Sequence, residues 1–213
     1  MLSADQLQSR RSLVHESADL SALLARLSTR ATALLRRSLE APEHKAQLTA
    51  DGGFCSEDRS PLEFDPWCPR SHRCPTCGRK HAGERHDRAW ARWQHLWLAE
   101  RAVELAVLGV LDGRTDAAKA AAGILASYAR RYADFPNRDN VLGPSRLFFS
   151  TYLESIWVTN YLAAAVFLRE AGTLDPALEQ GVSAVADEAA NLIGEFDEGF
   201  SNRQTWHNAA LAA

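Results

Sequence analysis

The sequence predicts an all-α protein in which antiparallel helix hairpins follow one another and a small cysteine-rich module is inserted. Three observations indicate this fold class. Ala-rich segments with a helical period dominate the second half of the chain, where β-branched residues are sparse. Short polar loops separate these segments, and short loops make neighbouring helices antiparallel. All four cysteines fall within residues 55–77, where no helical period is visible. Hairpins of this kind build bundles or (α/α) toroids.

The composition excludes several classes of protein. The chain has 213 residues, of which 46% are hydrophobic and 24% are charged, which excludes disorder over most of its length. A net charge of −3 argues against a protein built wholly to coat nucleic acid. No run of about 18 apolar residues is present, so we expect no membrane-spanning helix.

The residues at the two ends of the sequence suggest that the chain is incomplete. Met1 is followed by Leu-Ser-Ala-Asp-Gln, and the apolar region of a secretion signal does not follow. The apolar stretch 206–213 has no capping glycine and no basic last turn. We therefore expect either a cytoplasmic protein or a lost start, and truncation at the C-terminus.

The first segment, residues 1–50, is predicted to be helical. Leucines recur at three- and four-residue spacing on one face, and arginines occupy the solvated positions. The sequence Asp51-Gly52-Gly53 then ends the helix. The apolar face comprises Leu20, Leu23, Leu24, Leu27, Leu34 and Leu35.

Five further helices are predicted within the last segment, residues 87–213. Asp87 has the side chain of a good N-cap, and Asp175-Pro176 combines an N-cap with a proline at the first helical position. The predicted helices run from Asp87 to Asp112-Gly113, from Thr115 or Asp116 to about Tyr132, through Tyr152 and Trp157 to near Gly172, from Pro176 to Glu198-Gly199, and from Ser201 or Asn202 onward.

The cysteine-rich module, residues 51–86, predicts a structural zinc site. Cys74-Pro-Thr-Cys77-Gly78 is a knuckle that turns two thiolates toward one ion, and zinc takes four ligands. A short hairpin over residues 54–64 precedes this knuckle, which is the order of a small zinc ribbon. The candidate ligands of Zn²⁺ are Cys74 and Cys77, with Cys55 and either Cys68 or His72.

Two other chemistries remain open for these cysteines. Disulfides suit an oxidising compartment, although nothing else in the sequence indicates one. A redox-active Cys-x-x-Cys pair needs a thioredoxin-like βαβ context, and the sequence has none.

Seven basic residues surround the module and face only Glu84 and Asp87 locally. They form either a solvated surface or a binding surface for an anionic partner, which would be a polyuronate or a nucleic acid. The seven are Arg70, Arg73, Arg79, Lys80, Arg85, Arg88 and Arg92.

Two polar clusters have the chemistry of a sugar-binding site. In the stretch 201–208, a tryptophan stands among amides, a guanidinium and an imidazole, which suits ring stacking and carboxylate binding. A helix start with a polar cap and one packed tryptophan explains the same residues almost as well. The second cluster, residues 137–154, is a polar loop that leads into a helix and carries Arg146 and Tyr152.

Together these motifs resemble the heparinase II/III-like polysaccharide lyases over about residues 15–213. The order is similar: a leading helix, the Cys-x-x-Cys-Gly knuckle, a Trp-rich helix beginning Asp87-Arg-Ala-Trp90, and the loop and helix over 137–154. The stretch Ser201-Asn-Arg-Gln-Thr-Trp206 resembles the Asn-Asn-His-Gly-Thr-Trp stretch of alginate lyases. The resemblance implies an incomplete (α/α) toroid with an inserted zinc-ribbon-like module, a β-sandwich domain downstream, and a periplasmic or secreted protein.

The resemblance also implies β-elimination at a uronic acid, with an acidic polysaccharide as substrate. From the charge and the hydropathy of the chain we expect no nucleic acid and no membrane as partner. Asn202 matches the amide that neutralises the substrate carboxylate. Arg203 stands where the alginate lyases have a histidine that acts as the base. Either His207, one helical turn further along, takes the role of the base, or Arg203 helps to neutralise the substrate carboxylate. The family's acid tyrosine is expected beyond Ala213. The candidate substrate-binding residues are Arg146, Tyr152, Gln204, Trp206 and Asn208.

Two other functions are compatible with the residues. A glycoside hydrolase on a similar toroid needs two carboxylates across a cleft. Glu154 on one side and Glu195, Asp197 or Glu198 on the other would supply them. Alternatively, the chain is a non-catalytic zinc-stabilised module that binds an acidic glycan or nucleic acid through residues 70–92.

Overall fold

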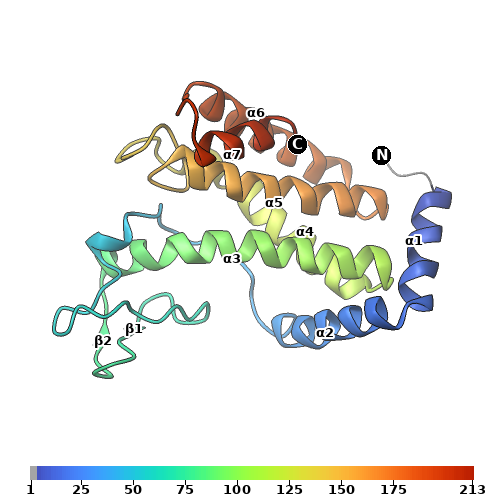
Figure 1. Ribbon diagram of the computed structural model, residues 1–213, viewed down its shortest axis with the longest axis horizontal. Coiled ribbons are helices and arrows are strands. Elements are labelled where there is room, and N and C mark those ends of the chain that lie inside the picture. Colours follow the sequence, from blue (N-terminus) through green and yellow to red (C-terminus); the bar gives the residue numbers. More distant parts are fainter. Residues whose placement is uncertain (1–3) are drawn as a thin grey trace. The chain divides into compact units, whose positions relative to one another are not determined.

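The structure, a computed structural model, describes residues 4–213 and confirms the all-α prediction (Figure 1). Helices account for 61% of the chain, and the only paired strands in the described range form one two-residue hairpin. The helices are α1 (Ala4–Glu16), α2 (Ala18–Leu34), α3 (Glu84–Leu111), α4 (Thr115–Ala129), α5 (Thr151–Glu170), α6 (Pro176–Gly194) and α7 (Asn202–Leu211). The strands are β1 (His72–Arg73) and β2 (Lys80–His81), and 3-10 turns span Thr49–Asp51 and Tyr132–Asp134.

The prediction of helix throughout residues 1–50 is wrong beyond Leu34. Ser17 divides the helical part in two, because its hydroxyl accepts from the amide of Leu20 and caps α2. Residues 35–48 carry no helix. In this stretch the backbone bonds to distant segments instead, as where the Ala46 amide donates to the Leu147 carbonyl at 2.8 Å.

Most of the later helix ends agree with the predicted turn residues, and two differ. Ser201 caps α7 by accepting from the amide of Gln204 at 3.0 Å, as its position predicts. Asp87 does not cap α3, which begins at Glu84; its buried carboxylate bonds to His72 and Arg70 instead. Helix α6 ends at Gly194, so Glu198 lies in the loop before α7 rather than in a helix.

The chain divides into two compact units, to which α3, α5 and α6 each contribute residues. The first unit comprises residues 1–40, 98–130 and 160–184. Within it, α4 packs closely on the end of α3, because Gly109 leaves room for Ala118. Tyr161 of α5 is buried against α4 and donates to the Leu125 carbonyl at 3.1 Å. These contacts bury the apolar faces that the helical period predicts.

The second unit comprises residues 41–97, 131–159 and 185–213 and contains every residue that the sequence marks as a candidate ligand or catalytic group. Its core is aromatic: the rings of Tyr132 and Trp157 stack with centroids 5.5 Å apart. Lys45, which is 4% exposed, donates to the carbonyls of Pro136, Arg138 and Ser145 and to the Asn140 side chain, all within 2.8 Å. A buried ammonium group therefore holds the loop that leads to α5.

None of the helices described in residues 4–213 combines the length and apolarity that crossing a bilayer requires.

Candidate functional site

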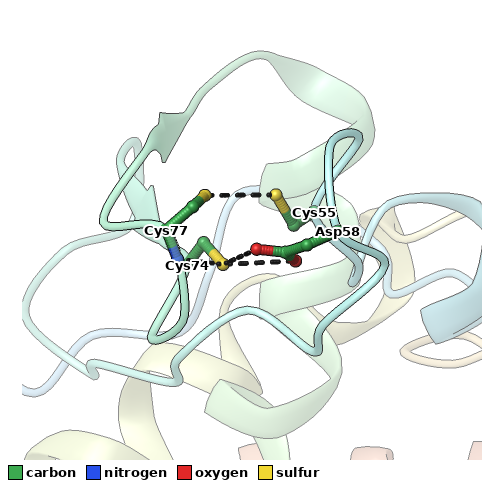
Figure 2. A group of neighbouring side chains, drawn as sticks. All are labelled: Cys55, Asp58, Cys74 and Cys77. Atoms are coloured by element: carbon green, nitrogen blue, oxygen red, sulfur yellow. Dashed lines mark hydrogen bonds between the residues drawn. The ribbon is translucent and has the colours of Figure 1, made fainter.

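Four side chains of the cysteine-rich module converge on one point (Figure 2). They are Cys55, Asp58, Cys74 and Cys77, and one ligand atom from each lies within 4.8 Å of every other. The sulfur atoms of Cys55 and Cys77 are 3.7 Å apart, and the Asp58 carboxylate oxygens lie 3.3 and 3.5 Å from the Cys74 sulfur. This metal cluster, as we name the four residues, can hold a metal ion.

Two short turns build the metal cluster. The first is closed by an antiparallel bridge between Phe54 and Pro61, and the Cys55 amide donates to the Ser60 carbonyl. The second turn joins β1 to β2, where the Cys74 amide donates to the Arg79 carbonyl. Each turn contributes two ligands at i and i+3, one buried cysteine and one exposed residue.

The electrostatics of the metal cluster favour a bound cation. The Ser60 amide, with a smaller effect from the Cys74 thiol, holds the pKa of Asp58 well below its usual range. Burial opposes ionisation of Cys74, but the amides of Cys77 and Thr76 outweigh it and lower its pKa. For Cys77, the Arg79 amide favours the thiolate, yet burial and the neighbouring thiols raise its pKa to about 11. The Cys74 thiol therefore loses its proton more easily than an ordinary cysteine. The Cys77 thiol loses its proton less easily, and a bound cation would be needed to stabilise its thiolate.

The structure brings three of the five predicted metal ligands together and leaves two outside. Cys68 is exposed and does not belong to the metal cluster, and none of the cysteines forms a disulfide. His72 is buried and its Nε2 bonds to Asp87 at 2.8 Å. Sequence reasoning missed Asp58, although Cys55-x-x-Asp58 repeats the spacing of the knuckle and was the signal that could have found it.

The basic residues around the module are largely matched by carboxylates that are distant in sequence. Arg70 pairs with Glu43 and Asp87, and Arg79 pairs with Glu57 at 3.3 Å. Arg88 lies 3.8 Å from an aspartate, and Arg73 lies 4.0 Å from a glutamate. The surface is therefore of mixed charge, which weakens its attraction for a polyanion.

A second polar group lies at the start of α7 and contains the predicted catalytic residues. Arg203 Nε is 3.1 Å from the Glu198 carboxylate, and His207 Nε2 is 3.9 Å from the same oxygen. The Gln204 side chain accepts from the Glu198 amide and donates to the Asn208 side chain. We name seven of these residues the α7 cluster: Glu198, Asn202, Arg203, Gln204, Trp206, His207 and Asn208.

Burial divides the α7 cluster into two kinds of residue. His207 is fully buried, and burial lowers its pKa against the opposing effect of Glu198. Asn202 and Asn208 are exposed, and Trp206 is 39% exposed. A ligand in solvent can therefore contact the amides of Asn202 and Asn208, the Trp206 indole and the outer part of Arg203, whereas the His207 imidazole is not accessible to it.

The predicted substrate-binding loop reaches the segment that precedes α7. Gly143, whose φ is +78°, leaves room for the Phe196 ring, because a Cβ there would lie 2.5 Å from ring atoms. The Phe196 ring lies 6.2 Å from the ring of His207. Arg146 is held by Glu188 at 2.6 and 2.9 Å and by two carbonyls, so the guanidinium is already neutralised. Tyr152 is half-buried on the first turn of α5.

Glu154, a candidate carboxylate for hydrolysis, is fully buried. Tyr132 and Ser145 each donate to it at 2.5 Å, and the Leu147 amide donates at 3.1 Å. Burial raises the pKa of Glu154 in spite of these donors. Glu154 therefore stabilises the loop through its bonds to Ser145 and Leu147, and its carboxylate is not accessible to a ligand.

No protein-family model, no curated protein and no solved structure matches this chain.

Proposed function

We propose that the chain is part of a polysaccharide lyase that cleaves a uronic-acid-containing glycan by β-elimination, with its helices contributing to an (α/α) toroid. The observation that supports this function is the approach of the 137–154 loop to the α7 cluster through Gly143 and Phe196. These are the two segments in which the resemblance expects substrate binding and catalysis.

The exposed residues of the α7 cluster suit a uronate. The Asn202 amide and the outer guanidinium of Arg203 neutralise the sugar carboxylate, which makes the C5 proton more acidic and stabilises the enolate-like transition state. Trp206 offers a ring for the apolar face of a sugar. His207 is buried beside Glu198, so it does not reach the C5 proton. The base that takes this proton and the acid that protonates the leaving oxygen therefore come from other parts of the lyase. Both arginines pair with a glutamate, but Arg146 is also held by two carbonyls and shapes the loop, whereas Arg203 is 39% exposed and its outer part can reach a sugar carboxylate.

Zinc is the metal that best fits the metal cluster, and the module then resembles a zinc ribbon. In a tetrahedron with sulfur at about 2.3 Å and oxygen at about 2.1 Å from zinc, neighbouring ligand atoms lie about 3.6–3.8 Å apart. The observed separations are 3.7 Å between two sulfurs and 3.3–3.5 Å between sulfur and oxygen. Bound zinc would supply structural stability to loops that have little core of their own.

The test incubates the protein, both as this chain and within any longer protein that contains it, with alginate, heparan, hyaluronan and other polyuronates. Ultraviolet absorbance follows the unsaturated uronate that elimination creates. We expect Asn202→Ala to lower the rate about a hundredfold, as loss of one charge-stabilising donor does. Thr205→Ala on the same helix is the matched control and should retain the rate.

Three outcomes contradict the proposal. Absence of reaction with every polyuronate removes the lyase assignment, and full activity of Asn202→Ala removes the role of the α7 cluster. A product with a new reducing end but no double bond indicates hydrolysis instead.

A further inference from the structure

A cavity of about 360 Å³ lies between the cysteine-rich loops and the first turns of α3, apart from the α7 cluster. Its walls are mainly apolar and aromatic, and it is lined among others by Leu62, Phe64, His72, His86, Trp90 and Trp93. Ligand-binding cavities have this range of volume and this combination of apolar walls with a few polar groups. No residue of the metal cluster or the α7 cluster lines it.

The two tryptophans of the cavity are held in fixed orientations. The Trp90 indole N–H donates to the Asp65 carbonyl at 2.8 Å, and its ring lies 6.1 Å from that of Phe64. The Arg92 guanidinium lies over the Trp93 ring, 4.6 Å from its centroid, and also donates to Thr49. Trp93 nevertheless remains 44% exposed, which marks the open side of the cavity. Rigid, partly exposed rings of this kind bind the apolar faces of ligands at little entropic cost.

Two imidazoles in the wall each have one nitrogen engaged by the protein. His86 Nδ1 donates to the Gly52 carbonyl at 2.6 Å, since a carbonyl only accepts. His72 Nε2 donates to the buried Asp87 carboxylate at 2.8 Å. Among residues 4–213, neither His86 Nε2 nor His72 Nδ1 has a hydrogen-bond partner. A hydroxyl group suits such a nitrogen, because it donates to a neutral imidazole and accepts from a protonated one.

The charged groups at the cavity are paired with other parts of the protein. Asp87 behind His72 also binds Arg70 at 3.0 Å, and Glu63 at the wall lies 4.0 Å from Arg73. The bound group is therefore uncharged, with an apolar face for the aromatic rings and hydroxyls for the imidazoles.

We propose that this cavity binds one uncharged pyranose ring of a glycan, with the ring against Trp93 and hydroxyls on His72 and His86. The site is separate from the elimination chemistry, and only the choice of acidic glycan probes rests on the proposed function. A pyranose ring meets both requirements of the wall, since its C–H groups form an apolar face and hydroxyls surround its edge.

The test titrates the zinc-loaded chain with two neutral probes, cellobiose and xylobiose, and with uronate oligosaccharides, and measures heat and tryptophan fluorescence. We expect at least one of the two neutral probes to bind, with affinity reduced at least tenfold in Trp93→Ala and in His86→Ala, and we expect the uronate oligosaccharides to bind more weakly. Phe200→Ala, which removes a fully exposed aromatic ring elsewhere in the same unit, is the control and should bind as the parent does. Metal content and circular dichroism establish that each variant is folded.

The results separate this proposal from the lyase assignment. Binding that depends on Trp93 and His86 supports the cavity site even when no polyuronate is cleaved. Absence of binding by both neutral sugars, or binding that these two variants leave unchanged, overturns it. Binding of the apolar dye anilinonaphthalene sulfonate that no sugar displaces also overturns it and indicates a hydrophobic ligand.

Discussion

The carboxylate of Asp58 lies 3.3 Å from the sulfur of Cys74, although 16 positions separate the two residues. This contact adds a carboxylate to three thiols and completes a set of four ligand atoms. A structural zinc site needs four ligands, and carboxylate oxygen is an accepted one. The contact therefore makes Asp58 the residue whose replacement best tests the metal cluster.

Asp58→Ala should lower zinc affinity at least tenfold, because a ligand is lost and three thiolates remain. Competition with a chromogenic chelator measures the affinity. Glu57→Gln is the matched control, since Glu57 is adjacent, exposed and paired with Arg79. Equal zinc affinity in Asp58→Ala and the parent would show that Asp58 is not a ligand.

Zinc binding should strengthen as pH rises through neutrality. The Cys77 pKa of about 11 means that this thiol is protonated at pH 7 and must release its proton to bind zinc. This residue alone contributes about a tenfold gain in affinity for each pH unit between about pH 6 and pH 8. Calorimetry in buffers of different ionisation enthalpy counts the protons released. Binding without proton release contradicts thiolate ligation.

Lys45→Met should destabilise the second unit by about 3 kcal/mol, because buried acceptors of an ammonium group lose their donor. Burial already lowers the Lys45 pKa to about 8, and the four acceptors around Nζ offset that cost. Denaturant unfolding followed by circular dichroism measures the change. Lys80→Met, at an exposed position, is the control and should shift stability by less than about 0.5 kcal/mol. A similar shift in both variants would argue against the network.

Acid should unfold the chain in part through His95. This imidazole is fully buried between Phe135 and Phe148, and burial lowers its pKa from 6.5 to about 3. The unfolded state binds the proton first, so the stabilisation is complete above about pH 6.5 and is lost as pH falls toward 3. The slope from this group is about 1.4 kcal/mol per pH unit between those values.

The variant His95→Phe keeps a ring in the same place and removes the titration. Unfolding free energies at several pH values should therefore fall less steeply with acid in His95→Phe than in the parent. Parallel slopes would assign the acid sensitivity to other groups.

The sequence determined the helical elements of this protein because their signals are local. Apolar periodicity, Ser201 as a cap and Pro176 at a first helical position each act within one or two turns of chain, and the structure follows them. The Cys74-x-x-Cys77 knuckle is local in the same way, and both of its thiols belong to the metal cluster.

Only the tertiary structure decided how the polar side chains are paired. An aspartate looks the same in the sequence whether it caps a helix, lies on the surface or binds a metal. For this reason the sequence suggested a cap at Asp87 and gave no clear signal for Asp58. Arg146 has no acidic neighbour in sequence, yet Glu188 neutralises it from 42 positions away. Such pairs depend on where turns bring distant segments together, because a charge in a partly buried site is stabilised by whichever opposite charge the fold places beside it.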